Sequence, residues 1–299
     1  MSYLTEELLK EFDKNGYIVI ENVLDNEQIE NARNNLHNYL MKYKNISHEN
    51  ILSGIDTINC NIRKKGAVSE LFYSKFKMEI QLNEKIYMTF KELHKFIDPN
   101  CHDVVPYFDR VCWRLPDHIL KEGGLKLHID RNPWTNIKAK KIRNVQSFIS
   151  LTNHYGSSSG GLCIVPGFHK KFKGYFAKSY DNIEANKGGE FYRMNGKEHT
   201  NLQNNLEPVI IPAGSLVIWH NDIPHATCEN FTSYDTREVI YLTYLPTNYQ
   251  QNINYWKLQA KNFIQNIPPP SYNEYNNNVD RDYDINILSE FQKKLIGIN

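Results

Sequence analysis

Short runs of β-type residues fill the chain from about residue 103 onward, and they constrain the fold more than any other feature. The runs are rich in branched and aromatic residues and are separated by turn residues, as in antiparallel proteins. They cover residues 110–115, 125–130, 145–151, 162–165, 209–211, 216–219 and 239–245. Helical segments do not alternate with them, as they would in a doubly wound parallel sheet. The pattern therefore predicts a mainly β fold, a sandwich or a barrel.

Helical periodicity flanks this region. Leu4, Leu8 and Phe12 recur at four-residue spacing before Gly16, which predicts a short amphipathic helix that stops at the glycine, with a strand over 17–20 after it. A second helix is predicted from the capping-box spacing of Asp25 and Gln28. Its buried stripe would consist of Ile29, Ala32, Leu36 and Leu40.

The same periodicity returns near the C-terminus, at Ile285, Leu288, Phe291 and Leu295. We therefore expect one domain over 1–246, in which helices of 1–100 support a β core over about 103–246. A helical extension over 247–299 would follow. The polar stretch 180–205 lacks a clear period, which predicts an insertion or a mobile lid.

Charge and composition exclude several classes of protein. The 299 residues contain 35 Lys and Arg against 34 Asp and Glu, so the net charge of +1 lacks the basic excess of a nucleic-acid-binding protein. The N-terminus lacks a signal-peptide pattern, and no run of about 18 apolar residues occurs that could cross a membrane. The five cysteines are odd in number and scattered, which predicts neither disulfides nor a zinc site. These observations favour a soluble cytoplasmic protein in a reducing compartment.

The chemistry is expected to centre on a strand that contains His128 and Asp130. Apolar and polar residues alternate strictly over 124–130, so Lys126, His128 and Asp130 project from one face. A third ligand is available from the segment 214–225, in which an apolar strand runs into a turn with two histidines, His220 and His225. Two histidines and one carboxylate suit non-haem Fe(II), because three coordination positions stay open.

Arg237 opens the predicted strand over 239–245 and could direct its guanidinium into the same cavity. An arginine suits the binding of a carboxylate, because it forms two parallel hydrogen bonds and stays charged when it is buried. The competing interpretation is an ion pair of Arg237 with Asp235 or Glu238 at the rim.

Taken together in order, these segments resemble the phytanoyl-CoA dioxygenase family of Fe(II)/2-oxoglutarate oxygenases. The matching segments are residues 12–24, the motif at 128–130, residues 160–169, and His225 with Arg237. The resemblance implies a double-stranded β-helix, or cupin-like jelly roll. It also implies that His225 rather than His220 is the third iron ligand, because the family's ligand follows the proline of the turn.

For the co-substrate, the resemblance implies that 2-oxoglutarate chelates the iron and that Arg237 binds its far carboxylate. Gln146 matches a polar position near the co-substrate, and Lys126 is a further candidate for contacting it. With O₂, such an enzyme releases succinate and CO₂ and hydroxylates an unactivated C–H bond. The presence of Asp130 favours hydroxylation, because related halogenases lack this carboxylate. Phe168 departs from the family pattern, in which serine is commoner.

The substrate is expected to be a small metabolite or an acyl-type compound, with no nucleic acid or membrane as partner. Tyr107, Phe108 and Trp134 are candidates for the pocket wall, and the basic run 138–143 is a candidate for contacting an anion, although a solvated loop is the simpler interpretation. Two other classes stay open. One is a non-catalytic jelly-roll binding protein. The other is a zinc hydrolase, which would also need a placed general base.

Overall fold

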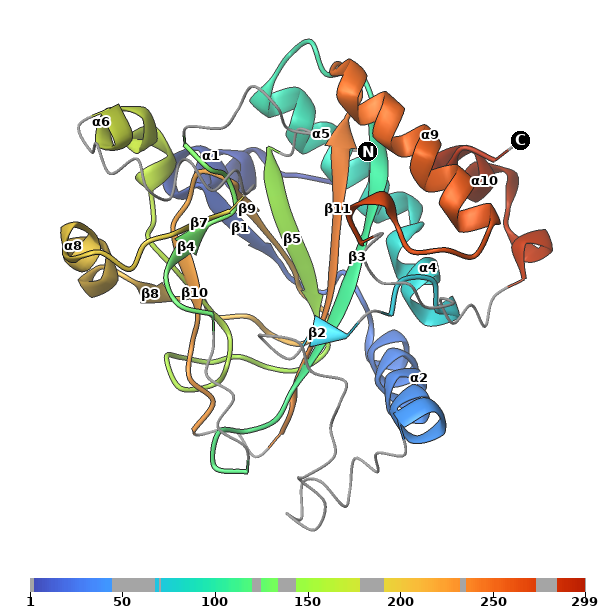
Figure 1. The fold of residues 1–299 in the computed structure, drawn as a ribbon, viewed down its shortest axis with the longest axis horizontal. Helices are drawn as coiled ribbons and strands as arrows, with labels where there is room; N and C mark the ends of the chain where they lie inside the picture. The colour runs from blue at the N-terminus through green and yellow to red at the C-terminus, as the bar shows by residue number, and fades with distance from the viewer. Residues whose placement is uncertain are drawn as a thin grey trace.

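The computed structural model describes residues 3–44, 68–69, 71–119, 125–133, 144–177, 191–231, 235–272 and 284–298. The strands in these ranges form two antiparallel sheets that face each other (Figure 1). The six-stranded sheet has the order β1-β9-β5-β11-β3-β2, and the five-stranded sheet has the order β7-β4-β10-β6-β8. This is the jelly-roll arrangement that the resemblance implied.

The strands of the six-stranded sheet are β1 (Tyr17–Ile20), β2 (Val68–Ser69), β3 (Val104–Arg114), β5 (Val145–Ser150), β9 (Leu216–His220) and β11 (Arg237–Pro246). Those of the five-stranded sheet are β4 (His128–Ile129), β6 (Leu162–Ile164), β7 (Tyr192–Arg193), β8 (Glu207–Pro208) and β10 (His225–Thr227). The α-helices in the described ranges are α1 (Glu6–Asn15), α2 (Asn26–Lys44), α4 (Lys75–Gln81), α5 (Glu84–Ile97), α6 (Phe172–Ala177), α8 (Thr200–Asn204), α9 (Gln250–Ile264) and α10 (Glu290–Ile296). Short 3-10 helices are η1 (Phe168–Lys170), η2 (Lys197–His199), η3 (Pro270–Tyr272) and η4 (Ile285–Ile287).

The two faces of the six-stranded sheet have different roles. Its outer face packs against helices: α5, α9 and α10 contact β3, and α5 also contacts β11 (Figure 1). Because side chains alternate along a strand, Ile240 and Leu242 of β11 join this outer core, whereas Val239 and Tyr241 face the other sheet. The space between the sheets is thus lined by every second residue of β5, β9 and β11.

The N-terminal expectations are confirmed. Helix α1 ends at Gly16, which has the left-handed conformation (φ 78°), and β1 then pairs with β9. A Cβ at Gly16 would lie 2.2 Å from Ile223 Cδ1, so the position also needs the space that glycine leaves. The capping box at the start of α2 is present, with Asp25 and Gln28 exchanging hydrogen bonds of 2.8 and 3.0 Å.

Several boundaries differ from the sequence-based ones. Of the expected strand 125–130, only His128–Ile129 is a strand in the structure. Residues 209–211 are not a strand either, although Ile211 forms an isolated bridge with His154. The short strand β10 was not expected. Of the stretch 180–205, for which an insertion or a mobile lid is predicted, the described part contains β7, η2 and α8. Helices also cover more of the chain than a mainly β fold implies.

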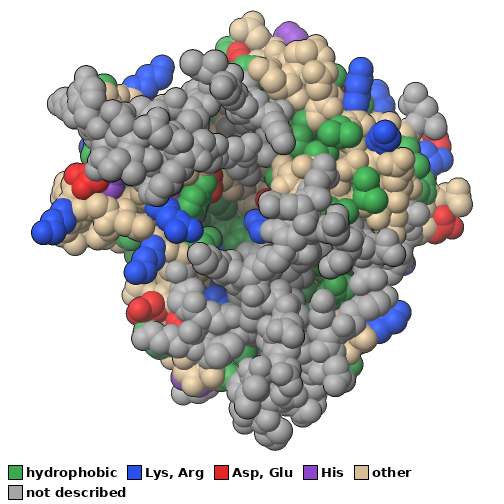
Figure 2. All heavy atoms as spheres, in the orientation of Figure 1, with side chains coloured by type: hydrophobic (Ala, Val, Ile, Leu, Met, Phe, Trp, Pro, Cys, Tyr) green, Lys and Arg blue, Asp and Glu red, His purple; other side chains and the backbone are tan. Residues whose placement is uncertain are grey.

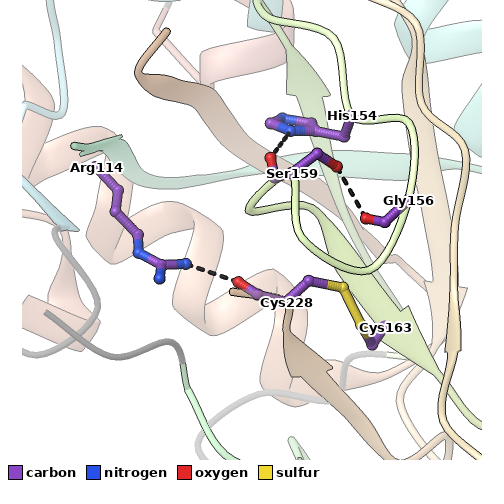
Figure 3. The surroundings of a disulfide bond; sticks show 6 residues. All are labelled: Arg114, His154, Gly156, Ser159, Cys163 and Cys228. Carbon is purple, nitrogen blue, oxygen red and sulfur yellow. Dashed lines mark hydrogen bonds between the residues drawn. A yellow bond between two sulfur atoms is a disulfide. The ribbon is translucent and has the colours of Figure 1, made fainter. Parts of the chain in front are cut away.

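The expectation of unpaired cysteines is wrong for two of the five. Cys163 in β6 and Cys228, just after β10, form a disulfide with a Cα–Cα distance of 5.8 Å (Figure 3). They lie diagonally across the β6–β10 pair, in which Cys163 faces Ala226. The pairing is invisible in the sequence because 65 positions separate the two residues. It also removes the argument for a reducing compartment, which rested on unpaired thiols.

Helices are found in the C-terminal segment, as expected, although the division into a domain and an extension stays a prediction. None of the helices in the described ranges is both long and apolar enough to cross a membrane.

Candidate metal and co-substrate site

The three expected metal ligands lie together in the five-stranded sheet. His128 of β4 and His225 of β10 face each other in the antiparallel register, with ring centroids 4.2 Å apart. Asp130 lies two residues beyond His128. Its Oδ2 is 3.1 Å from Nε2 of His225, and its Oδ1 is 3.8 Å from Nε2 of His128. One donor atom from each side chain lies within 4.8 Å of the others, which is the spacing of a group that can hold one metal ion.

Main-chain carbonyls fix the orientation of both imidazoles. Nδ1 of His128 donates to the Lys126 carbonyl at 2.7 Å, and Nδ1 of His225 donates to the Ile223 carbonyl at 3.0 Å. This arrangement leaves the Nε2 lone pairs for a metal, as is usual for metal-binding histidines. Burial and the nearby His225 imidazole lower the pKa of His128 to about 4, so this side chain is neutral at pH 7, as metal binding requires.

His220, the alternative third ligand, lies outside this group. Its Nδ1 accepts a hydrogen bond from the Asp222 main-chain N–H at 3.1 Å, and its ring lies 5.6 Å from that of His169. Burial and the neighbouring His169 lower the pKa of His220 to about 4. The structure therefore places His225, and not His220, beside His128 and Asp130.

A cavity of about 280 Å³ connects this triad with the six-stranded sheet. That sheet contributes side chains from β5, β9 and β11 to the wall, namely Gln146, Phe148, Trp219, Arg237 and Tyr241. Figure 2, in the orientation of Figure 1, shows a hollow near the centre of the face, with hydrophobic side chains in its depth and Lys or Arg side chains beside it. One sheet thus supplies the metal ligands, and the other supplies polar groups across the cavity.

The rim ion pair considered for Arg237 does not form. Asp235 and Glu238 both bind Arg33 of α2, with N–O distances of 2.9 Å for each. Glu238 also accepts a hydrogen bond from His37 at 2.7 Å. These carboxylates are therefore engaged behind the sheet and not in the cavity.

Arg237 itself is only 3% exposed and points into the cavity wall. Its Nη1 donates to Cys112 Sγ at 2.9 Å and to the Tyr241 hydroxyl at 3.4 Å, and its guanidinium carbon lies 5.4 Å from the Phe148 ring centroid. Within the described residues, its Nε has no hydrogen-bond partner and no carboxylate pairs with it. A buried guanidinium in this state is suited to binding an anion.

Gln146 of β5 lines the same cavity, and its buried Nε2 has no partner among the described residues. Two unsatisfied donors, on Gln146 and Arg237, thus face a cavity that also holds the triad. This donor set fits a bound metal with a carboxylate-bearing co-substrate. Lys126 is different, because its side chain is exposed and does not line the cavity. Only its main-chain carbonyl contributes, by holding His128.

The expected aromatic wall is partly found. Tyr107 lines the cavity, but Phe108 packs in the core under the helices, because it projects from the opposite face of β3. Trp134 and the basic run 138–143 lie outside the described residues.

Six polar residues of the wall were not predicted from the sequence: Asp109, Arg110, Thr227, Tyr241, Ser271 and Tyr272. Tyr241 could have been found, because it lies four positions beyond Arg237 on one strand and therefore on the same face. Tyr272 has no such signal, since it belongs to the C-terminal segment and reaches the cavity only in the folded chain.

Comparison with known proteins agrees with this geometry. The family model for phytanoyl-CoA dioxygenase (PhyH) matches residues 12–239. A curated protein of Dictyostelium discoideum, named "Putative phytanoyl-CoA dioxygenase", is 21% identical over 293 residues, which cover 85% of this chain and 80% of the relative. The GlcNAc-inducible protein GIG2 (DUF1479) of Candida albicans shares the fold, with a TM-score of 0.77 and 18% identity over 99% of this chain and 76% of its own.

A more distant structure, EctD from S. alaskensis with 2-oxoglutarate and 5-hydroxyectoine, has a TM-score of 0.55 and 13% identity, and covers 83% of this chain and 78% of its own. At these identities the two structures establish the fold alone. The family match, by contrast, covers most of the chain and includes the His128, Asp130 and His225 positions. The chain belongs to the phytanoyl-CoA dioxygenase family.

Proposed function

We propose that this protein is an Fe(II)- and 2-oxoglutarate-dependent oxygenase that hydroxylates an unactivated C–H bond of a small molecule. The observation that carries the proposal is the shared cavity, in which a His/Asp/His triad lies with a buried arginine that lacks a carboxylate partner among the described residues. An iron-binding triad alone would fit several activities. The added anion site is what a co-substrate with two carboxylates needs.

His128, Asp130 and His225 would hold the iron. Three coordination positions stay open in such a triad, enough for a chelating 2-oxo acid and O₂. When bound, the iron would supply the O₂ chemistry that is coupled to release of succinate and CO₂. Asp130 favours hydroxylation as the outcome, because its carboxylate occupies the position that a halide takes in related halogenases.

The other residues of the wall would bind and orient the co-substrate. Arg237 would pair with the far carboxylate of 2-oxoglutarate, and the Tyr241 hydroxyl, which already contacts Arg237, would hold the guanidinium in place. Gln146 would donate its free Nε2 hydrogens to a co-substrate oxygen. Phe148 and Trp219 line the same wall and would exclude water, which strengthens each of these polar contacts.

The experiment that tests the proposal is anaerobic addition of Fe(II) and then 2-oxoglutarate. A weak visible charge-transfer band should appear only when both are present. Admission of O₂ should release succinate, and with the correct substrate one product should gain the mass of one oxygen atom. A zinc hydrolase would show no such band, and a non-catalytic binding protein would release no succinate. Either result would overturn the proposal.

A further inference from the structure

A second arginine in the cavity owes its position to an irregularity in β3. The register between β11 and β3 shifts between Ile240, which faces Val111, and Leu242, which faces Phe108. Two consecutive residues, Asp109 and Arg110, therefore lie opposite Tyr241. A β-bulge of this kind re-aims side chains, and here both residues line the cavity instead of pointing to opposite faces.

The C-terminal segment holds this arginine in place. Tyr272 of η3 places its ring under Arg110, with the guanidinium carbon 4.8 Å from the ring centroid. The Tyr272 hydroxyl donates to Asp109 Oδ1 at 2.5 Å, and Arg110 Nε donates to the same oxygen at 3.2 Å. Tyr272 thus fixes both members of the pair, across a sequence separation of 163 residues.

Asp109 does not engage the end of the guanidinium. Its Oδ1 is shared by three donors, which are Arg110 N–H, Arg110 Nε and the Tyr272 hydroxyl. Within the described part of the chain, no acceptor is bonded to the two terminal nitrogens of Arg110. The side chain is 30% exposed, so it is accessible from the cavity yet partly shielded from water. A fixed guanidinium with two available N–H groups is suited to an oxyanion.

Arg237 and Arg110 therefore present two separate anion sites in one cavity. The proposed function assigns Arg237 to the co-substrate, which leaves Arg110 for the molecule that is oxidised. Resting on that function, we propose that the primary substrate carries a carboxylate or phosphate group that binds the terminal nitrogens of Arg110. The C-terminal segment, through Tyr272, then determines substrate specificity. The cavity has a volume of about 280 Å³, at the small end of small-molecule sites.

The test measures anion binding by calorimetry to protein loaded with Mn(II) and saturated with 2-oxoglutarate, so that Arg237 is already occupied. The probes are propionate, methyl phosphate and the neutral propionamide. We expect one of the two anions to bind and propionamide not to bind. Tighter binding of propionate would identify a carboxylate substrate, and tighter binding of methyl phosphate would identify a phosphorylated one.

Three variants locate the anion. Arg110→Gln should weaken binding of the preferred probe by about 10- to 100-fold, the range for loss of hydrogen bonds to a charged group. Arg110→Lys should recover part of the lost affinity for the probe. Tyr272→Phe, which keeps the ring, should weaken binding of the probe less than Arg110→Gln does. Lys170→Gln is the control, because it removes one positive charge from an exposed ion pair with Asp13. It should leave binding unchanged.

Two different failures can be told apart. If Arg110→Gln binds the probe as the wild type does, or if no anion binds to the loaded wild type, the Arg110 site is wrong while the proposed function stands. If Mn(II)-loaded wild type does not bind 2-oxoglutarate, and the probe affinity instead falls in Arg237→Gln, the anion site belongs to Arg237. That result overturns both proposals.

Discussion

His128 and His225 are directly opposed across two antiparallel strands, and their imidazole centroids lie 4.2 Å apart. The distance between the two Nε2 atoms is therefore set by strand register and not by a loop. Since a one-residue slip would turn a side chain to the other face, the register of a two-residue strand determines whether a metal site exists at all.

The first prediction concerns these ligands. His128→Ala, Asp130→Ala and His225→Ala should each abolish turnover and weaken Fe(II) binding by about tenfold or more, because two protein ligands hold a labile divalent ion poorly. His220→Ala should keep metal affinity, since its ring lies apart from the triad. Fe(II) titration under anaerobic conditions measures both. If His220→Ala lost the metal and His225→Ala kept it, the ligand assignment would be wrong.

The second prediction concerns Arg237. Arg237→Ala should raise the apparent KM for 2-oxoglutarate strongly, because a desolvated carboxylate without its partner costs about 2 to 5 kcal/mol. Arg237→Lys should recover only part, since a lysine cannot form the two parallel hydrogen bonds. Tyr241→Phe, which removes a 3.4 Å contact to Arg237, should have a small effect. The readout is succinate release against 2-oxoglutarate concentration. An unchanged KM for 2-oxoglutarate in Arg237→Ala would mean that another residue binds the far carboxylate of the co-substrate.

Much of this site could be predicted because its information is local. The alternation over 124–130 placed His128 and Asp130 on one face. The segment 214–225 contains two histidines, His220 and His225, as candidates for the third ligand. The choice between His220 and His225 needed the resemblance or the coordinates. Asp109 and Arg110 could not be predicted, because strict alternation assigns them to opposite faces and only the pairing with β11 reveals the bulge. The disulfide could not be predicted for the same reason, since it depends on which strands become neighbours.

The third prediction concerns the disulfide. Cys163→Ala/Cys228→Ala should lower the free energy of unfolding by about 3 to 5 kcal/mol, the chain-entropy expectation for a loop of this length. Urea unfolding of the variant measures this difference. A reducing agent should destabilise the wild type but not the variant, because Cys101 and Cys112, the two other cysteines in the described ranges, are buried and form no disulfide there. Equal stability of the two proteins in non-reducing buffer would show that the bond does not form in solution.

The fourth prediction concerns Lys77, which is fully buried in α4. Its Nζ donates to the Phe72 carbonyl at 3.1 Å and to Gln81 Oε1 at 3.0 Å, and burial lowers its pKa from 10.5 to about 7. The unfolded chain therefore binds more protons than the folded one between pH 7 and 10.5, so stability rises with pH across that window. The destabilisation of the folded protein by the buried charged amine is fully present below pH 7 and disappears towards pH 10.5.

Lys77→Met should remove this pH dependence. The difference in unfolding free energy, variant minus wild type, should fall by up to about 3 kcal/mol as the pH rises from roughly 7 to 9.5, at 1.36 kcal/mol per pH unit. Lys170→Met, at an exposed lysine, serves as the control and should show a flat difference. A flat difference for Lys77→Met as well would mean that this amine stays charged in the folded protein.

The position of β11 has a consequence for synthesis of the chain. Among the described residues it is the last strand in the sequence, yet it lies in the interior of the six-stranded sheet, between β5 and β3. While the ribosome adds the roughly one hundred residues that follow β5, the edges of β5 and β3 that β11 later covers have no partner, for about 5 to 20 seconds at ordinary translation rates. Their apolar edges are exposed during that interval. A sheet whose neighbouring strands were consecutive in the sequence would shorten that interval.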